Sequence, residues 1–222
     1  MTTRRARALV GVVLVAAATG CTTTVTGSAT WPGARLERVL LTAADFPDGV
    51  EYARIPDEPS GRGGPTSAPP MLSFPEGCAD GLTKVIEDNA VRGPGSAAEY
   101  VVGYDGARTV MTVLTWSLDL DRLAATAQRC ARFETYFDPA DEGIPMTTTR
   151  IPTPRPDALV YRQTMTLGGT ESSVYFSFEN IGTMAVFGIA FPTPNPSIAA
   201  KGALPQTFLE ISGRQAERIG AG

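Results

Sequence analysis

Residues 159–191 read LVYRQTMTLGGTESSVYFSFENIGTMAVFGIAF, and this stretch decides the fold. It contains three runs rich in β-branched and aromatic residues, which are residues 159–167, 173–179 and 183–191. Gly168-Gly169 joins the first two runs and Asn180-Ile181-Gly182 joins the last two, and both are typical hairpin connections. Because strands joined by tight turns run antiparallel, the stretch predicts an antiparallel meander of three strands.

A second hairpin is predicted upstream of the meander. Residues 100–104 and 109–118 have strand character, and Asp105-Gly106 between them is a dipeptide typical of tight hairpin turns. Residues 109–118 carry apolar side chains on both faces. We therefore expect this strand to lie in the interior of the sheet.

Helices are predicted around these strands. Residues 120–137 carry one apolar stripe at spacings of three and four, formed by Leu120, Leu123, Ala127, Cys130, Phe133 and Phe137. Asp80 precedes a second amphipathic segment, and Pro205 stands near the start of a third. We expect a single domain at residues 35–222 of the α+β class, an α/β sandwich in which an antiparallel sheet of five or six strands packs against helices. A surface loop rich in Gly and Pro is expected at residues 57–70.

The first twenty residues have the layout of a secretory signal. Three arginines and the apolar run ALVGVVLVAAA precede the small residues Thr19 and Gly20. This run is shorter than the roughly 20 apolar residues that a membrane-spanning helix needs. A cysteine directly after a small residue resembles the bacterial lipobox, in which the thiol is acylated and the chain is cut before it. We therefore expect a lipoprotein signal peptide at residues 1–20, lipid attachment at Cys21 and a flexible tether at residues 21–34. The alternative is an ordinary signal peptide that leaves Cys21 as a free thiol.

The two remaining cysteines form an even pair in an exported chain, which is the setting in which disulfides form. Cys78 precedes one predicted helix, and Cys130 lies on the apolar face of another. A disulfide that closes a loop of about 50 residues contributes roughly 4 kcal/mol in the chain-entropy model. We expect a Cys78–Cys130 disulfide, with two buried free thiols as the alternative.

Composition and motifs disfavour several function classes. The chain has no histidine and no G-x-S-x-G motif, which disfavours serine hydrolysis. Beyond the signal, 16 basic residues stand against 23 acidic ones without a basic stripe, so no nucleic-acid partner is expected. Asp119 and Asp121 are interpreted as a helix cap and dipole partner rather than a metal site, and residues 138–143 as a solvated loop rather than a calcium site. We expect no catalytic residue, no metal and no cofactor, while a pair of hydrolytic carboxylates stays open as an alternative.

Large apolar side chains on the sheet are the candidates for ligand binding. If the helices cover only part of the sheet, a groove floored by aromatic residues would suit an apolar or amphipathic ligand. The candidate residues are Trp116, Tyr161, Phe187 and Phe191. Packing in the core is the competing interpretation for each of them.

The segment LLTAADFPDGVEY at residues 40–52, shortly after the lipobox, carries a family resemblance. It resembles the secreted lipoproteins of mycobacteria and related actinobacteria, whose functions are uncharacterised. Those proteins are similar in turn to the extracellular sensor domain of a mycobacterial Ser/Thr protein kinase. The resemblance implies an antiparallel sheet flanked by helices, disulfide support and a groove that takes a ligand. The sensor domain has two disulfides, whereas this chain can form only one beside an acylated Cys21.

These observations together predict a lipid-anchored, non-catalytic module on the outer face of the cytoplasmic membrane or in the cell envelope. It would act as a ligand-binding or accessory protein for an apolar or amphipathic envelope molecule, with the membrane as its attachment partner. The alternatives are a carboxylate-based envelope hydrolase and a structural partner of an envelope protein complex.

The predicted anchor can be tested by replacing Cys21. Cys21→Ala removes the only thiol that the predicted lipobox can acylate. The variant is expected to move from the membrane fraction to the soluble fraction and to lose labelling by a fatty-acid probe. Unchanged labelling of the variant would contradict lipid attachment at this residue.

Overall fold

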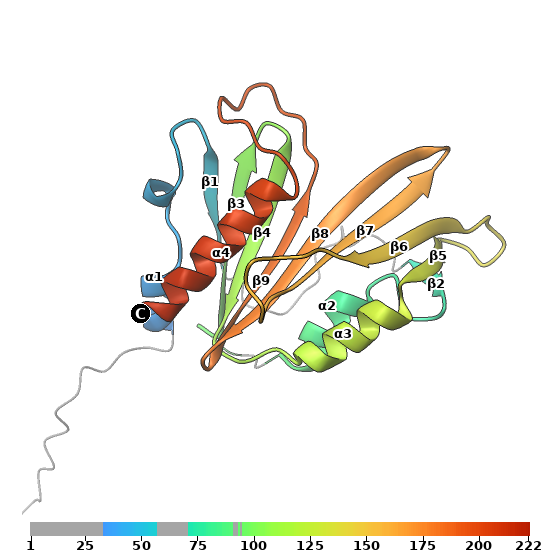
Figure 1. Ribbon diagram of the computed structural model, residues 1–222, viewed down its shortest axis with the longest axis horizontal. Helices are drawn as coiled ribbons and strands as arrows, with labels where there is room; N and C mark the ends of the chain where they lie inside the picture. Colours follow the sequence, from blue (N-terminus) through green and yellow to red (C-terminus); the bar gives the residue numbers. More distant parts are fainter. Residues whose placement is uncertain (1–32, 57–70, 91–92, 94) are drawn as a thin grey trace, which may run out of the picture.

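A single antiparallel sheet of nine strands organises the structure, a computed structural model that describes residues 33–56, 71–90, 93 and 95–222. The strands lie in the order β1-β3-β4-β9-β8-β7-β6-β5-β2 (Figure 1). Their bounds are β1 Glu51–Ile55, β2 Leu72–Phe74, β3 Ala97–Tyr104, β4 Ala107–Leu114, β5 Arg132–Tyr136, β6 Ile144–Arg150, β7 Leu159–Leu167, β8 Thr170–Ile181 and β9 Met184–Phe191. The helices are α1 Gly33–Val39, α2 Gly81–Asp88, α3 Leu120–Arg129 and α4 Gln206–Gly220, with a short 3₁₀ turn, η1, at Ala43–Asp45. The α+β class is confirmed, but the described sheet has nine strands rather than five or six.

The predicted meander is present as β7, β8 and β9. Its turns use glycine where the backbone has positive φ, at Gly168, Gly169 and Gly182, with values of 57°, 78° and 60°. Other residues rarely adopt this conformation, so these glycines fix the turns and hence the register of the strands. Residues 109–118 were expected to form a strand in the interior of the sheet. This is confirmed, because β4 lies between β3 and β9. The strand is shorter than predicted and ends at Leu114.

The prediction of one helix over residues 120–137 is wrong in its second half. Helix α3 ends at Arg129, and the chain continues as strand β5, which pairs with β2 and β6. In β5 the side chains alternate, so that Phe133 and Thr135 are buried, while Arg132 and Glu134 are exposed and Tyr136 is half-buried. The spacing of Phe133 from α3 imitates a helical stripe, but the two-residue alternation of the strand decides the structure. Phe137, the last member of the predicted stripe, is 61% exposed.

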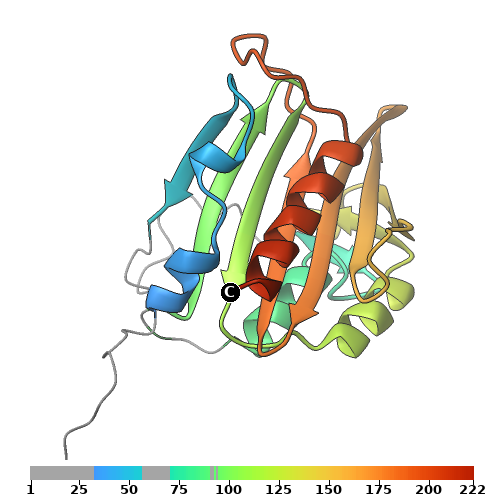
Figure 2. The same ribbon diagram turned by 60° about the vertical axis from the view of Figure 1, so that its left-hand side comes forward.

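Helices lie on both sides of the sheet and form two separate cores (Figures 1 and 2). Consecutive residues of a strand point to opposite faces, so one strand supplies both cores. In β4, Val113 packs with α1 and α4, while Leu114 packs with α2 and α3. In β9, Val186 belongs to the first core and Ala185 to the second.

The predicted disulfide is present and joins Cys78 to Cys130. Cys78 lies just before α2, and Cys130 is the residue that ends α3. Phe133 of β5 packs against both cysteines. The bond therefore fixes the α2–α3 pair at the end of the sheet that contains β2 and β5. Cys21, the predicted signal peptide and the predicted loop at residues 57–70 lie outside the described residues.

A buried glutamine connects α4 to the N-terminal part of the domain. Gln215 has no solvent exposure. Its Oε1 accepts hydrogen bonds from the Leu41 backbone N–H at 3.1 Å and from the Tyr100 hydroxyl at 3.0 Å. Its Nε2 donates to the Val39 carbonyl at 2.8 Å. One side chain thus satisfies three polar groups of α1, the segment after α1, and β3.

Replacing this glutamine should lower stability strongly. Gln215→Ala leaves the Leu41 N–H, the Val39 carbonyl and the Tyr100 hydroxyl without a partner in the core. The expected loss in the free energy of unfolding is about 3 kcal/mol, measured by urea unfolding. The matched control is Gln206→Ala, because Gln206 is an exposed residue of the same helix. A loss no larger than that of the control would contradict this role for Gln215.

Candidate functional site

One face of the sheet is covered by helices over only part of its width. Helices α2 and α3 lie on this side, and α3 packs against β6 and β7. The side of β1, β3, β4 and β9 that faces the same way is called the open face below. Its apolar side chains Val101, Val110, Phe187 and Ile189 are only half-buried. Val101, Val110 and Ile189 are direct neighbours across β3, β4 and β9.

A cavity of about 360 Å³ lies where the open face meets α2, and it is called the aromatic cavity below. It is lined by Thr83, Ile86, Glu87 and Ala90 of α2 and the following turn, and by Leu114, Trp116 and Phe187 of the sheet side. Phe187 stacks on the buried Phe178 with 5.3 Å between ring centroids. The indole N–H of Trp116 has no hydrogen-bond partner among the described residues. The lining is mostly apolar, and Thr83 and Glu87 of α2 are its polar members.

The structure brings together two of the four predicted binding residues. Trp116, which follows β4, and Phe187, in the middle of β9, line the same cavity. Tyr161 is 4% exposed and lies in the core with Phe178, at 6.4 Å between ring centroids. Burial raises the pKa of the Tyr161 phenol above its ordinary value. Phe191 is half-buried at the far end of β9, where it lies opposite Arg108 of β4.

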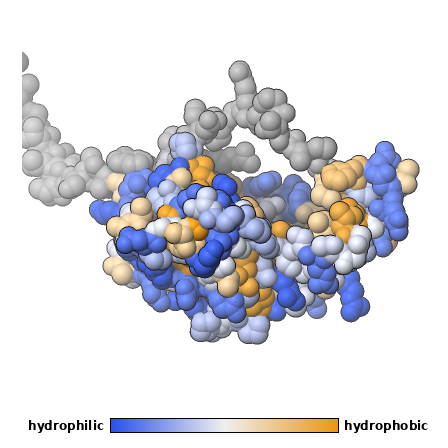
Figure 3. Space-filling model, turned by 90° about the horizontal axis from the view of Figure 1, so that it is seen from above, coloured by the Kyte–Doolittle hydropathy of each residue, from blue (hydrophilic) through white to orange (hydrophobic). Residues whose placement is uncertain are grey.

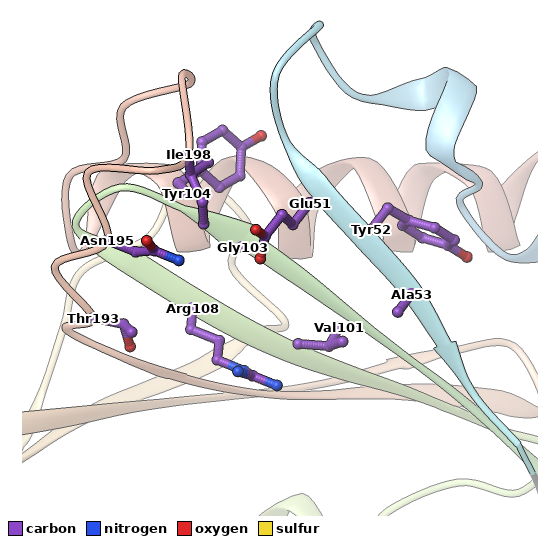
Figure 4. Close-up of a pocket in the computed structure, with 10 residues that line it drawn as sticks. All are labelled: Glu51, Tyr52, Ala53, Val101, Gly103, Tyr104, Arg108, Thr193, Asn195 and Ile198. Atoms are coloured by element: carbon purple, nitrogen blue, oxygen red, sulfur yellow. The ribbon is translucent and has the colours of Figure 1, made fainter.

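A second cavity, of about 340 Å³, opens at the other end of the open face, and it is called the polar cavity (Figure 4). Its lining residues are Glu51, Tyr52, Ala53, Val101, Gly103, Tyr104, Arg108, Thr193, Asn195 and Ile198. This cavity was not predicted from the sequence. The one signal for it was Gly103 inside a strand, since such a glycine often marks a place where another group approaches. A Cβ atom at this position would lie 3.3 Å from Ile198 Cδ1 and 3.4 Å from Glu51 Oε2.

The wall formed by residues 193–202 is held by the turn between β3 and β4. Asp105 Oδ1 accepts a hydrogen bond from the Asn195 N–H at 2.8 Å, and the Asp105 carbonyl accepts one from the Gly202 N–H at 2.9 Å. Lys201 forms an ion pair with the same carboxylate. The Lys201 ammonium, followed by the Asn195 N–H, holds the pKa of Asp105 below its ordinary value. These contacts hold residues 193–202 against the β3–β4 turn, so this wall of the polar cavity has a fixed position.

Each cavity of the open face has a single carboxylate in its lining, which is Glu51 in the polar cavity and Glu87 in the aromatic cavity. Asp119 Oδ1 accepts a hydrogen bond from the Arg122 N–H at 2.9 Å, which makes Asp119 the N-cap of α3. Within the described ranges, no group of three or more potential metal-ligating side chains was found. No helix in those ranges is long and apolar enough to cross a membrane.

No protein-family model matches the chain, and no curated protein matches its sequence. Among solved structures, it is similar to a putative uncharacterised protein of Mycobacterium smegmatis, the Rv0999 ortholog. The two share 12% sequence identity with a TM-score of 0.43, over 85% of this chain and 95% of that chain. The neighbour is thus weakly similar and is itself of uncharacterised function.

The contacts that Asp105 makes with Asn195, Lys201 and Gly202 are called the Asp105 clamp below. The clamp should protect the Asn195 amide from hydrogen exchange. Asp105→Ala removes the acceptor of the Asn195 N–H, so the amide of Asn195 is expected to exchange faster. Asp105→Asn, which keeps an Oδ1 acceptor, serves as the control and should protect this amide better than Asp105→Ala.

The clamp should also depend on pH. Because the folded pKa of Asp105 is lowered, the stabilisation by its carboxylate is present above the ordinary aspartate pKa of 3.8 and is lost as pH falls through the folded value. After correction for intrinsic exchange, protection of the Asn195 amide should therefore decrease in acid. The clamp would be contradicted if the Asn195 amide were equally protected in wild type and Asp105→Ala, and if acid did not change its protection in wild type.

Proposed function

We propose that the protein is a non-catalytic ligand-binding module of the cell envelope, and that its open face receives an apolar or amphipathic envelope molecule. The observation that carries this proposal is the aromatic cavity, with Trp116 and Phe187 in its lining and a volume of about 360 Å³. Binding sites for small molecules have volumes of roughly 300–1,000 Å³ and mostly apolar walls with few polar groups. The cavity satisfies both conditions.

The exposure of the open face supports the same function. Val101, Val110 and Ile189 are half-buried, although they stand on interior strands of the sheet. Removing apolar surface from water contributes about 25 cal/mol per Å². A ligand with an apolar part gains this stabilisation by covering these side chains, as α2 and α3 do on the neighbouring strands.

Attachment to the outer face of the cytoplasmic membrane through a lipid on Cys21 is the second part of the proposal. It is supported by the lipobox-like sequence and by the resemblance of residues 40–52 to mycobacterial lipoproteins, which in turn resemble a kinase sensor domain. Such an anchor would keep the module close to membrane lipids and other envelope amphiphiles. Its ligand would therefore be available at high local concentration.

A carboxylate-based hydrolase is less well supported. Glycoside hydrolysis commonly uses two carboxyl groups on either side of the scissile bond, about 5 to 9.5 Å apart. Neither cavity of the open face has two carboxylates in its lining, since the polar cavity has Glu51 and the aromatic cavity has Glu87.

A role as a structural partner has one observation in its favour. Phe74 and Phe137, near the β2–β5 edge of the sheet, are 71% and 61% exposed. Large exposed apolar patches mark interaction sites. Figure 3 shows one face of the molecule, which is mostly hydrophilic with hydrophobic residues in small patches. We favour the open face because it combines half-buried apolar side chains with the aromatic cavity.

Filling the aromatic cavity should weaken ligand binding. The probe is N-phenyl-1-naphthylamine, a neutral dye whose fluorescence rises in apolar surroundings. Ala90→Trp places a large side chain in the cavity and is expected to reduce affinity for the dye by at least about tenfold. The matched control is Leu167→Trp, because Leu167 is 57% exposed and lies outside the cavity lining.

The natural ligand can be sought with the same pair of variants. Native mass spectrometry of wild-type protein purified from its own envelope should show a co-purified amphiphile. Ala90→Trp should lose this adduct and Leu167→Trp should keep it. Equal dye affinity and equal adducts in all three proteins would contradict a ligand in the aromatic cavity.

A further inference from the structure

A glycine separates two opposite charges on the floor of the polar cavity. The strand register places Glu51 of β1 opposite Gly103 of β3, and Gly103 opposite Arg108 of β4. All three residues lie in one row on the open face and line the polar cavity (Figure 4). The two charged residues are separated by two interstrand spacings, which is about 10 Å between their Cα atoms. Because Gly103 has no side chain, Ile198 Cδ1 and Glu51 Oε2 lie 3.3 and 3.4 Å from the position that a Cβ would take, and the Glu51 carboxylate reaches over the strand toward the cavity.

The two charges in the lining of the polar cavity are available to a ligand. Both side chains are exposed. Neither forms an ion pair with another residue in the part of the chain that the structure describes. A guanidinium binds phosphate or carboxylate through two parallel N–H groups, and a carboxylate accepts hydrogen bonds from an ammonium. A zwitterionic group with one anionic and one ammonium end matches this pair.

A line of apolar side chains leads from the polar cavity to the aromatic cavity. Val110 follows Arg108 on the same face of β4, and Ile189 of β9 lies opposite Val110. Phe187, two residues before Ile189, lines the aromatic cavity. From Arg108 to Leu114, which also lines that cavity, β4 extends over about 20 Å. A ligand that reaches both cavities therefore needs a long apolar chain.

The order of these groups along the open face sets the order of groups in the ligand. Arg108, on β4, stands next to the apolar line, whereas Glu51, on the edge strand β1, stands beyond it. The anionic group of the ligand should therefore be attached to the chain, and the ammonium should be the terminal group. Among amphiphiles, this is the arrangement of a phosphate–ethanolamine headgroup.

We propose that the open face binds a zwitterionic lipid of this kind. Its phosphate contacts Arg108, its ammonium contacts Glu51 above Gly103, and its acyl chain crosses Val110 and Ile189 to the aromatic cavity. The inference rests on the proposed function of the aromatic cavity and adds the headgroup class to it.

The test compares three probes on the full-length protein by isothermal titration calorimetry below the critical micelle concentration. Lysophosphatidylethanolamine has the full zwitterion and a chain, lysophosphatidylglycerol has the same chain and phosphate without the ammonium, and free O-phosphoethanolamine has no chain. Wild type should bind the first lipid at least about tenfold more tightly than the second. Free O-phosphoethanolamine should bind far more weakly than either lipid, because it leaves the apolar line uncovered.

Four variants assign the headgroup contacts. Glu51→Gln should remove the preference for lysophosphatidylethanolamine and leave lysophosphatidylglycerol binding nearly unchanged, whereas Arg108→Gln should weaken both lipids by about tenfold. Matched controls are Glu171→Gln and Arg162→Gln, since both residues are exposed and lie outside the two cavities. The controls should behave like wild type.

The outcomes separate this inference from the function on which it rests. Equal binding of the two lipids, unaffected by Glu51→Gln, would overturn the zwitterionic headgroup and leave the aromatic cavity as a ligand site. Free O-phosphoethanolamine that binds as tightly as the lipid would overturn the lipid as the source of the zwitterion. Failure of both lipids to bind, together with equal dye affinity in wild type and Ala90→Trp, would overturn both proposals.

Discussion

The helices on one side of the sheet are too short to cover it, and the candidate site follows from this constraint. Helices α2 and α3 contain 8 and 10 residues, which corresponds to lengths of about 12 and 15 Å. Nine strands at about 4.8 Å spacing make a sheet nearly 40 Å wide. On this side the second core is complete only near α2 and α3. The remaining strands keep apolar side chains at the surface.

Two local constraints keep the uncovered region in a defined shape. The Cys78–Cys130 disulfide holds α2 and α3 toward the edge of the sheet that contains β2 and β5, away from the opposite edge strand β1. At the opposite end, Asp105 holds the segment 193–202 against the β3–β4 turn. The walls of both cavities thus exist before any ligand arrives. Preorganisation of this kind lowers the entropic cost of binding.

The sequence predicted those strands that are defined by their own residues and turns. Glycine turns and strong β propensity identified β7 to β9, and the apolar character of both faces placed β4 inside the sheet. Strands β1 and β2 escaped prediction because β1 is largely exposed and β2 has three residues, so pairing with distant segments defines them. Strand β5 was assigned to a helix because Phe133 continues the stripe of α3. Trp116 and Phe187 were predicted because they are large apolar residues. Glu51 and Arg108 come to lie on either side of Gly103 only through the register of three strands, which the sequence does not reveal.

The position of the last residue has a practical consequence for handling the protein. Gly222 lies against Val39 of α1, at the end of the domain where the described chain begins (Figures 1 and 2). The β3–β4 turn and the segment 193–202 lie at the other end. A sensor chip or a bead coupled through the C-terminus would therefore hold the molecule by the end that contains α1. The polar cavity would then face the solution.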